Sequence, residues 1–532
     1  MKEKPVLRLL AWGMALALLF ACAGCGGNEP NDPSDVSQTE PTSDTVQIRY
    51  NDLRLAYARG DKLDPFLCKT TVNRQLTTLM YDSLFTVDEH FEAKPLLAKE
   101  YSTDGLSVTV SVNTDVRFTD GTYMTPADVI YSFELAKESD AYKARLKNFD
   151  SASAVGTNVL LFTLASPDPY AVACLDFPIV KTGTSAQDRK KAAEELPEED
   201  APKTTDQMLP VGSGRYVLQY EENENDPVLV AFNDRFRGFY PSMSLIRLVN
   251  VTDSTALFYS LEIGNISFAF DDLSGGKYTR VNATISEYPM NNLVYLGMNQ
   301  DDAALANPAV RQAIAAAIDR QDILNVAFQG HATVTRTPFN PLWTPAAEYE
   351  TSHADPSVNA LEMLEKIGFD KINTYGVRNN GRISLNLDML VVEDNDFKRM
   401  AAQQIAKKLG ALNVKVHVTT LPKADFLNAV ELGKFDLYIG EISLTPNMNL
   451  DAFFGGSGAA AHGIWNKTAA DAYHGFLAGE MVFDAFMEAF NEDLPFIPLC
   501  YRRGIVASVK ELQGAQQAYV GDLFADIEDW HF

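Results

Sequence analysis

The sequence predicts an α/β fold with more than one lobe. Residues 106–112 (LSVTVSV) alternate apolar and polar side chains, which is typical of a half-buried strand. Nearer the C-terminus, an apolar stripe with helical spacing over 397–409 precedes an alternating strand at 414–418, and a further helix leads into a strand at 435–439. This alternation of strands and helices indicates an α/β class. The chain of 532 residues exceeds what one hydrophobic core usually supports, so two or three lobes are expected.

Two helix starts carry local capping signals. The segment 125–128 (TPAD) has the pattern of an N-cap, an N1 proline and an acidic N3 residue, so a helix is expected from there to about Lys137. Residues 307–308 (NP) predict a second start, after which apolar residues recur on one face over 310–318. By contrast, 185–208 is nearly all polar and predicts an exposed helix–loop excursion.

The amino terminus has the layout of a secretory signal. Three basic residues lie within positions 1–8, and no charge occurs over 9–23, where Leu and Ala dominate. This layout is typical of an exported protein, and the apolar stretch is shorter than the ~20 residues that a spanning helix needs. Small residues then precede Cys25 and the sequence turns polar, which resembles the lipobox of bacterial lipoproteins. We therefore expect residues 1–25 to form a lipoprotein signal peptide.

Two cysteines, Cys25 and Cys22, are candidate lipidation sites. Lipoboxes usually carry Leu three residues before the modified cysteine, and that position relative to Cys25 is occupied by Cys22. The rival register ending at Cys22 has Leu19, but it places the bulky Phe20 where a small residue is expected. Cys25 is the preferred lipidation site and Cys22 the alternative, while an ordinary cleaved signal would need neither. Residues 26–45, rich in Gly, Pro, Ser, Thr and acids, predict a disordered tether.

Charge and motifs exclude several functions. Lys and Arg number 45 against 71 Asp and Glu, a formal net charge of −26, which argues against nucleic acid as a partner because phosphate binding needs a basic surface. The sequence contains no G-x-x-x-x-G-K-[ST] loop, and its seven histidines are scattered singly, so neither an ATPase nor a zinc site is expected. Cys68, Cys174 and Cys500 are too few for a disulfide framework and are expected to be buried thiols. We expect no cofactor, no metal and no catalysis, although composition alone leaves a secreted hydrolase open.

Several segments, in order along the chain, resemble one family. The strongest is 116–133 (VRFTDGTYMTPADVIYSF), which resembles the family signature almost throughout. The segment 307–320 (NPAVRQAIAAAIDR) resembles the best known helix of the family. The other segments are 63–65, 79–84, 210–217, 338–343, 360–369, 433–436 and 495–499. The family is that of the extracellular solute-binding proteins of family 5, the oligopeptide, dipeptide and nickel binders of ABC importers.

The resemblance implies a two-lobed periplasmic-binding-protein-like fold of class II, in which the first α/β lobe carries an extra subdomain. By analogy, lobe I takes 46–86, 209–290 and 479–532, the extra subdomain takes 87–208, and lobe II takes 291–478. The hinges would lie near Pro289 and Gly479. A ligand that binds the closed state better would shift the population towards it.

The resemblance also implies a function. The protein would be the substrate-binding component of an ABC-type importer, which captures a small peptide or related polar solute and delivers it to permease subunits. It would act as a monomer, lipid-anchored to the outer face of the cell membrane or in the periplasm. Two alternatives within the family are a member that binds a non-peptide solute and a sensor that signals occupancy.

The sequence departs from peptide-binding members of the family at the ligand. Those members have a Trp-x-x-Asp after the Phe-Asp strand, and its carboxylate holds the α-ammonium of the peptide. Here Glu441 falls on the Trp position and Leu444 on the Asp position. Either Glu441 or Asp451 supplies a substitute carboxylate, or the protein does not hold a free peptide amine in the usual manner. Nickel is disfavoured because the sequence shows no cluster of metal ligands.

The candidate pocket residues mix aromatic and polar side chains, as a binding cleft does. They are Glu441, Asn447, Asp451, Trp465, Asn466, Tyr501 and Arg502, with Tyr57 and Arg59 as further candidates. Trp465 could instead be a core residue, and Arg502 with Arg503 could be a surface pair.

Overall fold

The computed structural model describes residues 52–194, 209–220, 226–251, 254–353, 358–455, 458–515 and 517–532. The chain divides into two units, Met1–Arg49 and Tyr50–Phe532, and the described helices and strands all belong to the second. The expected signal peptide, Cys22, Cys25 and the expected tether lie outside the described residues, as does 195–208 of the polar excursion. In the described part of the chain, no helix is long and apolar enough to cross a membrane.

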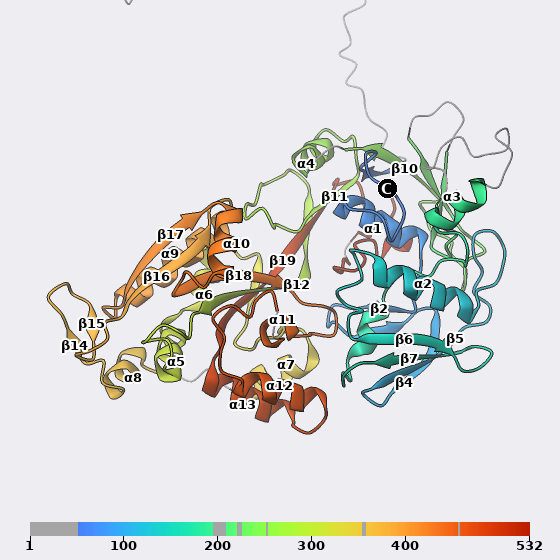
Figure 1. The fold of residues 1–532 in the computed structure, drawn as a ribbon. Helices are drawn as coiled ribbons and strands as arrows, with labels where there is room; N and C mark the ends of the chain where they lie inside the picture. The colour runs from blue at the N-terminus through green and yellow to red at the C-terminus, as the bar shows by residue number, and fades with distance from the viewer. Residues whose placement is uncertain are drawn as a thin grey trace, which may run out of the picture. The chain divides into compact units, whose positions relative to one another are not determined.

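A large mixed sheet of eleven strands organises the second unit (Figure 1). In order, its strands are β17 (Lys415–Leu421), β16 (Asn386–Val392), β18 (Leu437–Ser443), β12 (Thr284–Met298), β19 (Phe496–Ser508), β11 (Phe268–Asp271), β1 (Leu53–Tyr57), β10 (Leu245–Asn250), β9 (Val228–Ala231) and β8 (Tyr216–Gln219), and β13 (Ala332–Val334) pairs with β19 beside this path. The long strands β12 and β19 are antiparallel partners from Thr284 opposite Ser508 to Gly297 opposite Phe496. These two strands therefore connect the two ends of the sheet.

Two hydrophobic cores lie along this sheet, and β12 and β19 pass from one to the other. The first core includes side chains of β1 and β10, and the second includes side chains of β16 and β18. In β12, Met290 belongs to the first core and Leu293 to the second, and the strand pairing is irregular between Pro289 and Leu293, next to the expected first hinge. In β19, Ile505 belongs to the second core and Val506 to the first. The chain thus packs as two α/β halves joined by two continuous strands.

The second core extends further along the chain than the limit expected for lobe II. Gly479, the other expected hinge, lies between α12 (Thr468–Leu477) and α13 (Phe483–Asp493). Phe476 and Phe486 from these helices stack with their ring centroids 6.0 Å apart, and both belong to the second core. Because α13 buries its apolar face there, the crossing to the first core comes later, within β19.

Local sequence signals place the helices of the second half. α5 (Pro308–Ala317) begins after Asn307, whose side chain accepts a hydrogen bond from the backbone of Ala309, as expected for an N-cap. α9 (Asp396–Gly410) buries the apolar stripe predicted over 397–409. Further elements of this half are α6 (Arg320–Val326), α7 (Thr344–Ser352), α8 (Ala360–Lys366), β14 (Lys371–Ile372), β15 (Arg378–Asn379), α10 (Lys423–Glu431) and α11 (Asp451–Phe454).

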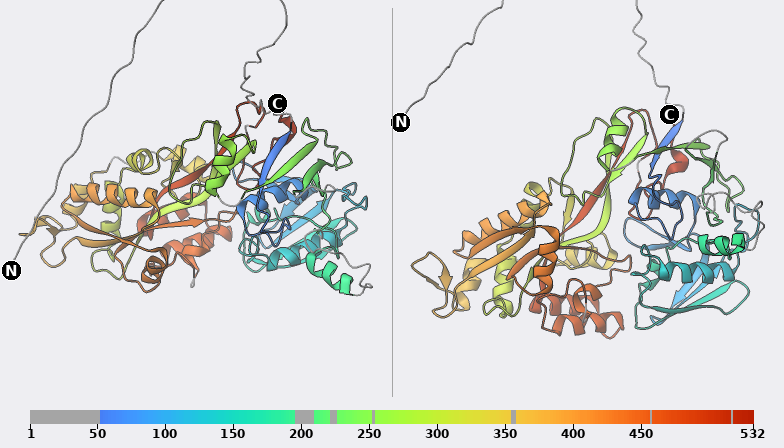
Figure 2. Two further views of the ribbon diagram at one scale, coloured as in Figure 1. Left: turned by 90° about the horizontal axis from the view of Figure 1, so that it is seen from above. Right: turned by 45° about the horizontal axis from the view of Figure 1, so that its top comes forward.

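A separate four-stranded antiparallel sheet forms within the range expected for the extra subdomain (Figure 2). Its strands, in order, are β4 (Ala98–Thr103), β5 (Ser107–Val112), β7 (Val159–Leu164) and β6 (Phe149–Ala154), and β5 is the strand predicted from the alternation at 106–112. α2 (Pro126–Glu138) starts with the capping box predicted at 125–128. Phe133 of α2 meets the rings of Phe149 and Phe162, so the helix covers this sheet.

The Gly-Ser-Gly turn at 212–214 packs against the end of α1 (Thr71–Met80). A Cβ at Gly212 would lie 2.4 Å from the carbonyl oxygen of Met80, and one at Gly214 would lie 2.2 Å from its carbonyl carbon. Glycine is required because the two backbones approach too closely for any side chain. Other elements of this half are β2 (Phe85–Val87), β3 (Ala93–Pro95), η1 (Ala171–Cys174), α3 (Ala186–Glu194), α4 (Ser254–Glu262) and η3 (Ile527–Asp529).

Candidate ligand-binding site

Glu441 is a buried carboxylate held by two cations. It lies on β18 opposite Val294, and its side chain is 10% exposed. Lys398 Nζ and Arg502 Nε each lie 2.7 Å from its oxygens, and Asn292 Nδ2 donates to it at 3.1 Å. Burial by itself would raise the pKa of Glu441, but the two cations lower the pKa below its usual value. The charge of Glu441 is therefore compensated inside the protein and is not free for a ligand ammonium.

Arg502 links this carboxylate to the segment that follows β11. Its side chain is 2% exposed, and its Nη1 and Nη2 donate to the carbonyls of Leu273 and Asp272, each at 2.7 Å. Its Nε contact with Glu441 is an ion pair without hydrogen-bond geometry. Arg502 therefore connects Glu441 to two backbone carbonyls in the interior, and it does not form a surface pair with Arg503.

Leu444 packs as a core residue. It is 5% exposed and belongs to the second core. Its backbone N–H donates to the carbonyl of Asn291 at 2.8 Å, and its own carbonyl accepts from Asn291 Nδ2 at 3.1 Å. The position where the resemblance places an amine-binding carboxylate is therefore filled by a buried aliphatic side chain.

Asn447, on the same loop, contacts the buried carboxylate of Asp168, which lies in the range expected for the extra subdomain. Asn447 Nδ2 donates to Asp168 Oδ2 at 2.6 Å, and Thr445 Oγ1 donates to Asn447 Oδ1 at 2.6 Å and so orients the amide. Asp168 is 1% exposed and also accepts from the backbone of Tyr170 at 2.9 Å. Burial raises the pKa of Asp168 to about 6, although these two hydrogen bonds oppose the shift. No cation among the described residues pairs with this carboxylate.

Aromatic and polar contacts surround that hydrogen bond. The ring of Tyr170 lies edge-on to Trp343 with centroids 4.9 Å apart, and 6.0 Å from the ring of Phe476. Thr344 Oγ1 donates to Glu92 Oε1 at 2.6 Å. Residues of the range 87–208 therefore contact residues of the second core.

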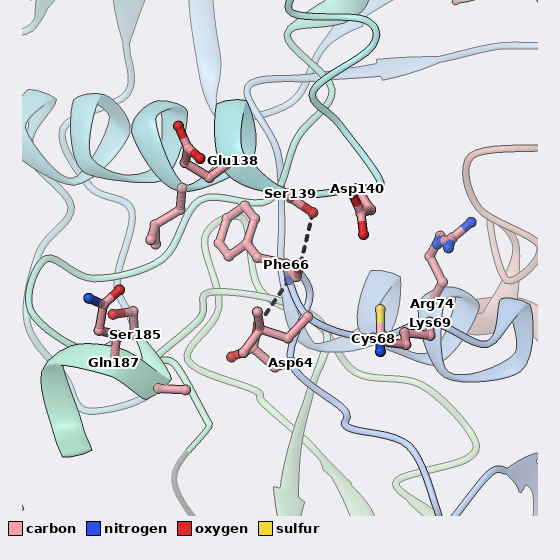
Figure 3. A pocket seen from close by; sticks show the side chains of 13 residues that line it. Asp64, Phe66, Cys68, Lys69, Arg74, Glu138, Ser139, Asp140, Ser185 and Gln187 are labelled. Carbon is pink, nitrogen blue, oxygen red and sulfur yellow. Dashed lines mark hydrogen bonds between the residues drawn. The ribbon is translucent and has the colours of Figure 1, made fainter.

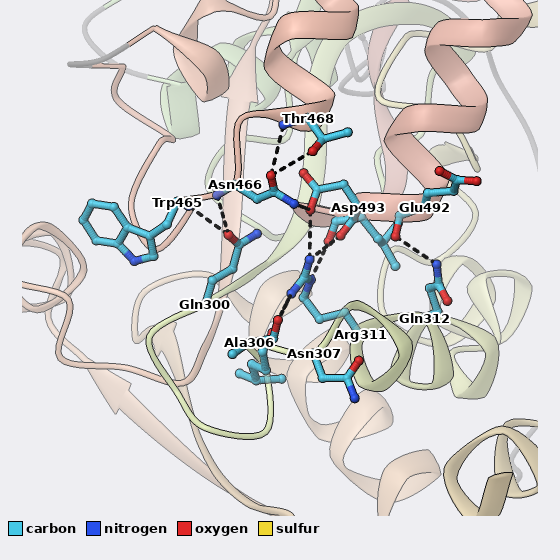
Figure 4. Close-up of polar contacts among 12 residues, drawn as sticks. Gln300, Ala306, Asn307, Arg311, Gln312, Trp465, Asn466, Thr468, Glu492 and Asp493 are labelled. Carbon is cyan, nitrogen blue, oxygen red and sulfur yellow. Dashed lines mark hydrogen bonds and ion pairs between the residues drawn. The ribbon is translucent and has the colours of Figure 1, made fainter. Parts of the chain in front are cut away.

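Trp465 and Asn466 belong to a different cluster, around Asp493 (Figure 4). Both of their backbone N–H groups donate to Gln300 Oε1 at 2.9 Å. Asn466 Nδ2 donates to Asp493 Oδ1 at 2.6 Å, and Arg311 pairs with the same oxygen at 3.0 Å. The amide of Asn466 therefore joins the start of α12 to the end of α13. Trp465 is 63% exposed, so it is not a core residue.

The remaining candidates lie apart from both groups. Asp451 starts α11, and its half-exposed carboxylate lies 3.2 Å from Asn449 Nδ2 and 3.7 Å from His474 Nε2. Tyr501 is buried, and its hydroxyl donates to the carbonyl of Pro338 at 2.8 Å.

Tyr57 and Arg59 form a small group of their own at the end of β1. Both hydrogen-bond the carboxylate of Asp226, and Arg59 Nε also donates to the Tyr57 hydroxyl at 3.2 Å. The described contacts of this group stay within the first half of the sheet and do not reach Glu441 or Arg502.

The structure brings Glu441 and Arg502 into direct contact, and the other candidates make their contacts with different partners. Sequence reasoning missed Lys398 and Asp168. Lys398 lies on α9 beside the buried stripe, and nothing local connects it to Glu441. Asp168 stands in a Pro-Asp-Pro run, which signals a turn and gives no hint of a buried carboxylate.

Several cavities lie elsewhere in the described residues, and two of them are large enough to hold a small molecule. One, of about 460 Å³, lies between the 64–69 loop, the end of α2 and the start of α3 (Figure 3). Its wall includes the buried Asp64, which accepts from the backbone of Phe66 at 2.9 Å, and Ser139, which donates to the carbonyl of Phe66 at 2.8 Å. The other, of about 570 Å³, lies between α1 and the C-terminal segment.

In the part of the chain that is described, no group of three or more His, Cys, Asp or Glu side chains is arranged to hold a metal ion. Cys68, Cys174 and Cys500 are buried free thiols, as the sequence predicts.

The family follows from comparison with known sequences. The profile of the bacterial extracellular solute-binding proteins, family 5, middle region, matches residues 92–461. The chain belongs to this family. It is also 28% identical over 319 residues to the glutathione-binding protein GsiB of Salmonella typhimurium strain LT2. That match covers 58% of this chain and 59% of the relative, so it spans less than two thirds of the relative's length.

Solved structures show the fold. Oligopeptide-binding AppA from Bacillus subtilis, in complex with a nonapeptide, is 20% identical with a TM-score of 0.56 and covers 90% of this chain and 98% of its own. NikZ from Campylobacter jejuni, in complex with Ni(L-His), is 20% identical with a TM-score of 0.60 and covers 90% and 99%. The α/β, periplasmic-binding-protein-like fold predicted from the sequence is therefore confirmed.

Proposed function

We propose that this chain is the substrate-binding component of an ABC-type importer, which captures a small peptide or a related polar solute and delivers it to a membrane permease. The observation that carries the proposal is the pair of separately packed cores joined by β12 and β19, in a chain of this family. A solute that contacts both halves binds the closed arrangement more tightly and shifts the population towards it. This function makes and breaks no bond, so the chain would not be an enzyme.

The contacts of Glu441 and Leu444 limit which carboxylate can bind the ammonium group of a ligand. Glu441 is neutralised by Lys398 and Arg502, and Leu444 is in the core, so neither offers a carboxylate to a ligand ammonium. Asp168 adjoins the same loop through Asn447 and has no cationic partner in the described structure. We assign the binding of a ligand amine to Asp168, with Asn447 as the group that the amine would displace.

A non-peptide solute is the second candidate. The burial of Leu444 favours it, because the position that holds a free peptide amine in the resembling proteins is apolar in this chain. A sensor of occupancy would use the same closure without transport, and the two roles differ only in the partner that recognises the closed form.

We further propose an extracytoplasmic location with a lipid on Cys25, Cys22 being the alternative, and a monomeric state. The acidic tether over 26–45 would separate the anchor from the folded unit. Metabolic labelling with palmitate tests this: Cys25→Ser should lose the label and Cys22→Ser should keep it.

Thermal unfolding of the mature protein tests the proposed function. The ligand pools would be free di- to octapeptides, the same peptides with acetylated amines, nickel and sugars. A ligand at about 100 times its dissociation constant should stabilise the protein by about 2.7 kcal/mol. A shift with free peptides that is lost in Asp168→Asn supports amine binding there, and a shift with blocked peptides or sugars supports the second candidate. If no pool shifts the midpoint, the proposed ligand class is wrong.

A further inference from the structure

The cavity of about 570 Å³ is distinct from the candidate site described above. It lies between α1, the β2–β3 region, the segments around Tyr142 and Asp176 of the extra subdomain, and residues 517–528 near the C-terminus. None of the pocket residues predicted from the sequence lines it. Its volume falls within the roughly 300–1,000 Å³ range of small-molecule sites.

Ion pairs hold the walls of this cavity in place. They are Arg235 with Asp82 at 2.7 Å, Arg215 with Asp522 at 2.6 Å, and Arg145 with Asp176. Each pair joins segments that are distant in the sequence, and the side chains involved are at most 25% exposed. Because the charges within each pair compensate one another, the three pairs contribute little net charge to the wall.

Arg74 lines both this cavity and the neighbouring one of about 460 Å³, and it has no such partner. Its Nε is buried without a hydrogen bond, and its guanidinium pairs with no described carboxylate. Figure 3 shows Arg74 extending away from the part of the neighbouring cavity formed by Asp64 and Phe66. Arg74 also lies in the first turns of α1, where the helix dipole disfavours a cation. Arg74 is partly buried, and a cation that lines a cavity without a carboxylate partner can pair there with the anionic group of a ligand.

Asp176 and Tyr142 each have an oxygen atom that makes no hydrogen bond with a described residue. Asp176 Oδ1 is buried without a hydrogen bond, although the carboxylate pairs with Arg145 through its other oxygen. The hydroxyl of Tyr142 makes no hydrogen bond with a described residue. Arg145 lies over the Tyr142 ring at 5.2 Å. Burial raises the pKa of Tyr142, and the charges of Arg145, Asp176 and Arg74 also act on it. Tyr142, Arg74 and Asp176 all line the cavity.

We propose that this cavity binds a small zwitterion of amino-acid size, with its carboxylate on Arg74 and its ammonium on Asp176 Oδ1. The planar guanidinium can donate two parallel hydrogen bonds to a carboxylate, and an ammonium satisfies the carboxylate oxygen that is left without a donor. A ligand with only a negative charge would leave Asp176 Oδ1 without a hydrogen-bond donor. A ligand with only a positive charge would be repelled by Arg74. The site is separate from the proposed transport ligand, so either can be correct without the other.

Calorimetric titration of the mature protein with the free L-amino acids tests this proposal, with their N-acetyl and amide derivatives as probes that each lack one charge. At least one free amino acid should bind, and its two derivatives should not. Arg74→Gln and Asp176→Asn should each weaken binding by about tenfold or more, because each removes one partner of a buried charge pair. Lys143→Gln is the matched control, since it removes a neighbouring cation that is 56% exposed and does not line the cavity.

A purely structural role for Arg74 predicts a different result. In that case Arg74→Gln would lower the unfolding midpoint of the ligand-free protein, whereas our proposal expects that midpoint to stay equal or rise, because an unpaired charge is removed. Absence of binding by every free amino acid, or binding that survives both Arg74→Gln and Asp176→Asn, overturns the proposal. The peptide response of the candidate site should be unaffected by either variant.

Discussion

At the scale of single residues, the charge state of Asp168 depends on contacts made far from its own segment. Its raised pKa means that the folded protein binds a proton more tightly than the unfolded chain, so its contribution to stability is largest at low pH and is lost as pH rises from 3.8 to about 6. We expect the free energy of unfolding of Asp168→Asn to gain about 3 kcal/mol relative to the wild type across that window. Urea unfolding at a series of pH values measures this difference.

The comparison with wild type cancels the general effect of acid on a chain with a formal net charge of −26. Asp394→Asn is the matched control, because that carboxylate is exposed in the turn before α9. Equal pH profiles for Asp168→Asn and wild type would show that Asp168 is solvated in solution, and its assignment as the amine-binding group would fail with it.

Arg502 and Arg503 are adjacent in the sequence and should respond very differently to removal. Arg502→Met removes one of the two cations that compensate Glu441 and leaves two buried backbone carbonyls without their donor, and breaking such a buried pair costs about 3–5 kcal/mol. Arg503→Met removes a pair with Glu287 in which the arginine side chain is 39% exposed, which should cost about 1 kcal/mol or less. Chemical denaturation measures both, and similar losses would contradict the interior role of Arg502.

At the scale of elements, the Gly-Ser-Gly turn shows how one close backbone contact joins two segments. Gly212→Ala places a Cβ 2.4 Å from the carbonyl oxygen of Met80 and 2.5 Å from the ring of Tyr81, so we expect a loss of about 2–3 kcal/mol. Gly410→Ala at the end of α9 meets nothing within 4 Å, so stability should stay the same or rise by up to about 1 kcal/mol. The midpoint of thermal unfolding distinguishes the two, and an unchanged midpoint for Gly212→Ala would mean that the turn can move.

Element boundaries that depend on local signals agree between sequence and structure. Alternation predicted β5, and the caps at 125–128 and 307–308 predicted the starts of α2 and α5, because hydrogen bonds within a few residues determine them. The extent of the second core could not be inferred in that way. It follows from α13 packing against α12, which is a contact between faces and not a property of either helix alone.

At the scale of the whole molecule, closure of the two halves should be visible in hydrogen exchange. A ligand that favours the closed state should slow exchange of amides in the 444–450 loop, where Asn447 meets Asp168, by about tenfold, equivalent to about 1.4 kcal/mol. Amides in the central β12–β19 ladder that exchange by local motion should change little, since that ladder lies within the connection between the cores. A ligand that raises the unfolding midpoint and leaves the loop unaffected would bind without closure.

The sequence by itself determined the α/β class, the positions of the capped helices and the alternating strand, and the resemblance to family 5. These properties depend on period, capping and motif order, all of which are local or linear along the chain. Only the tertiary structure decided which charges are free. Glu441 is neutralised by Lys398 and Arg502, and Asp168 meets Asn447 from 279 positions away. The ionisation of a buried carboxylate depends on the cations and donors that the fold brings to it, and linear order does not specify those neighbours.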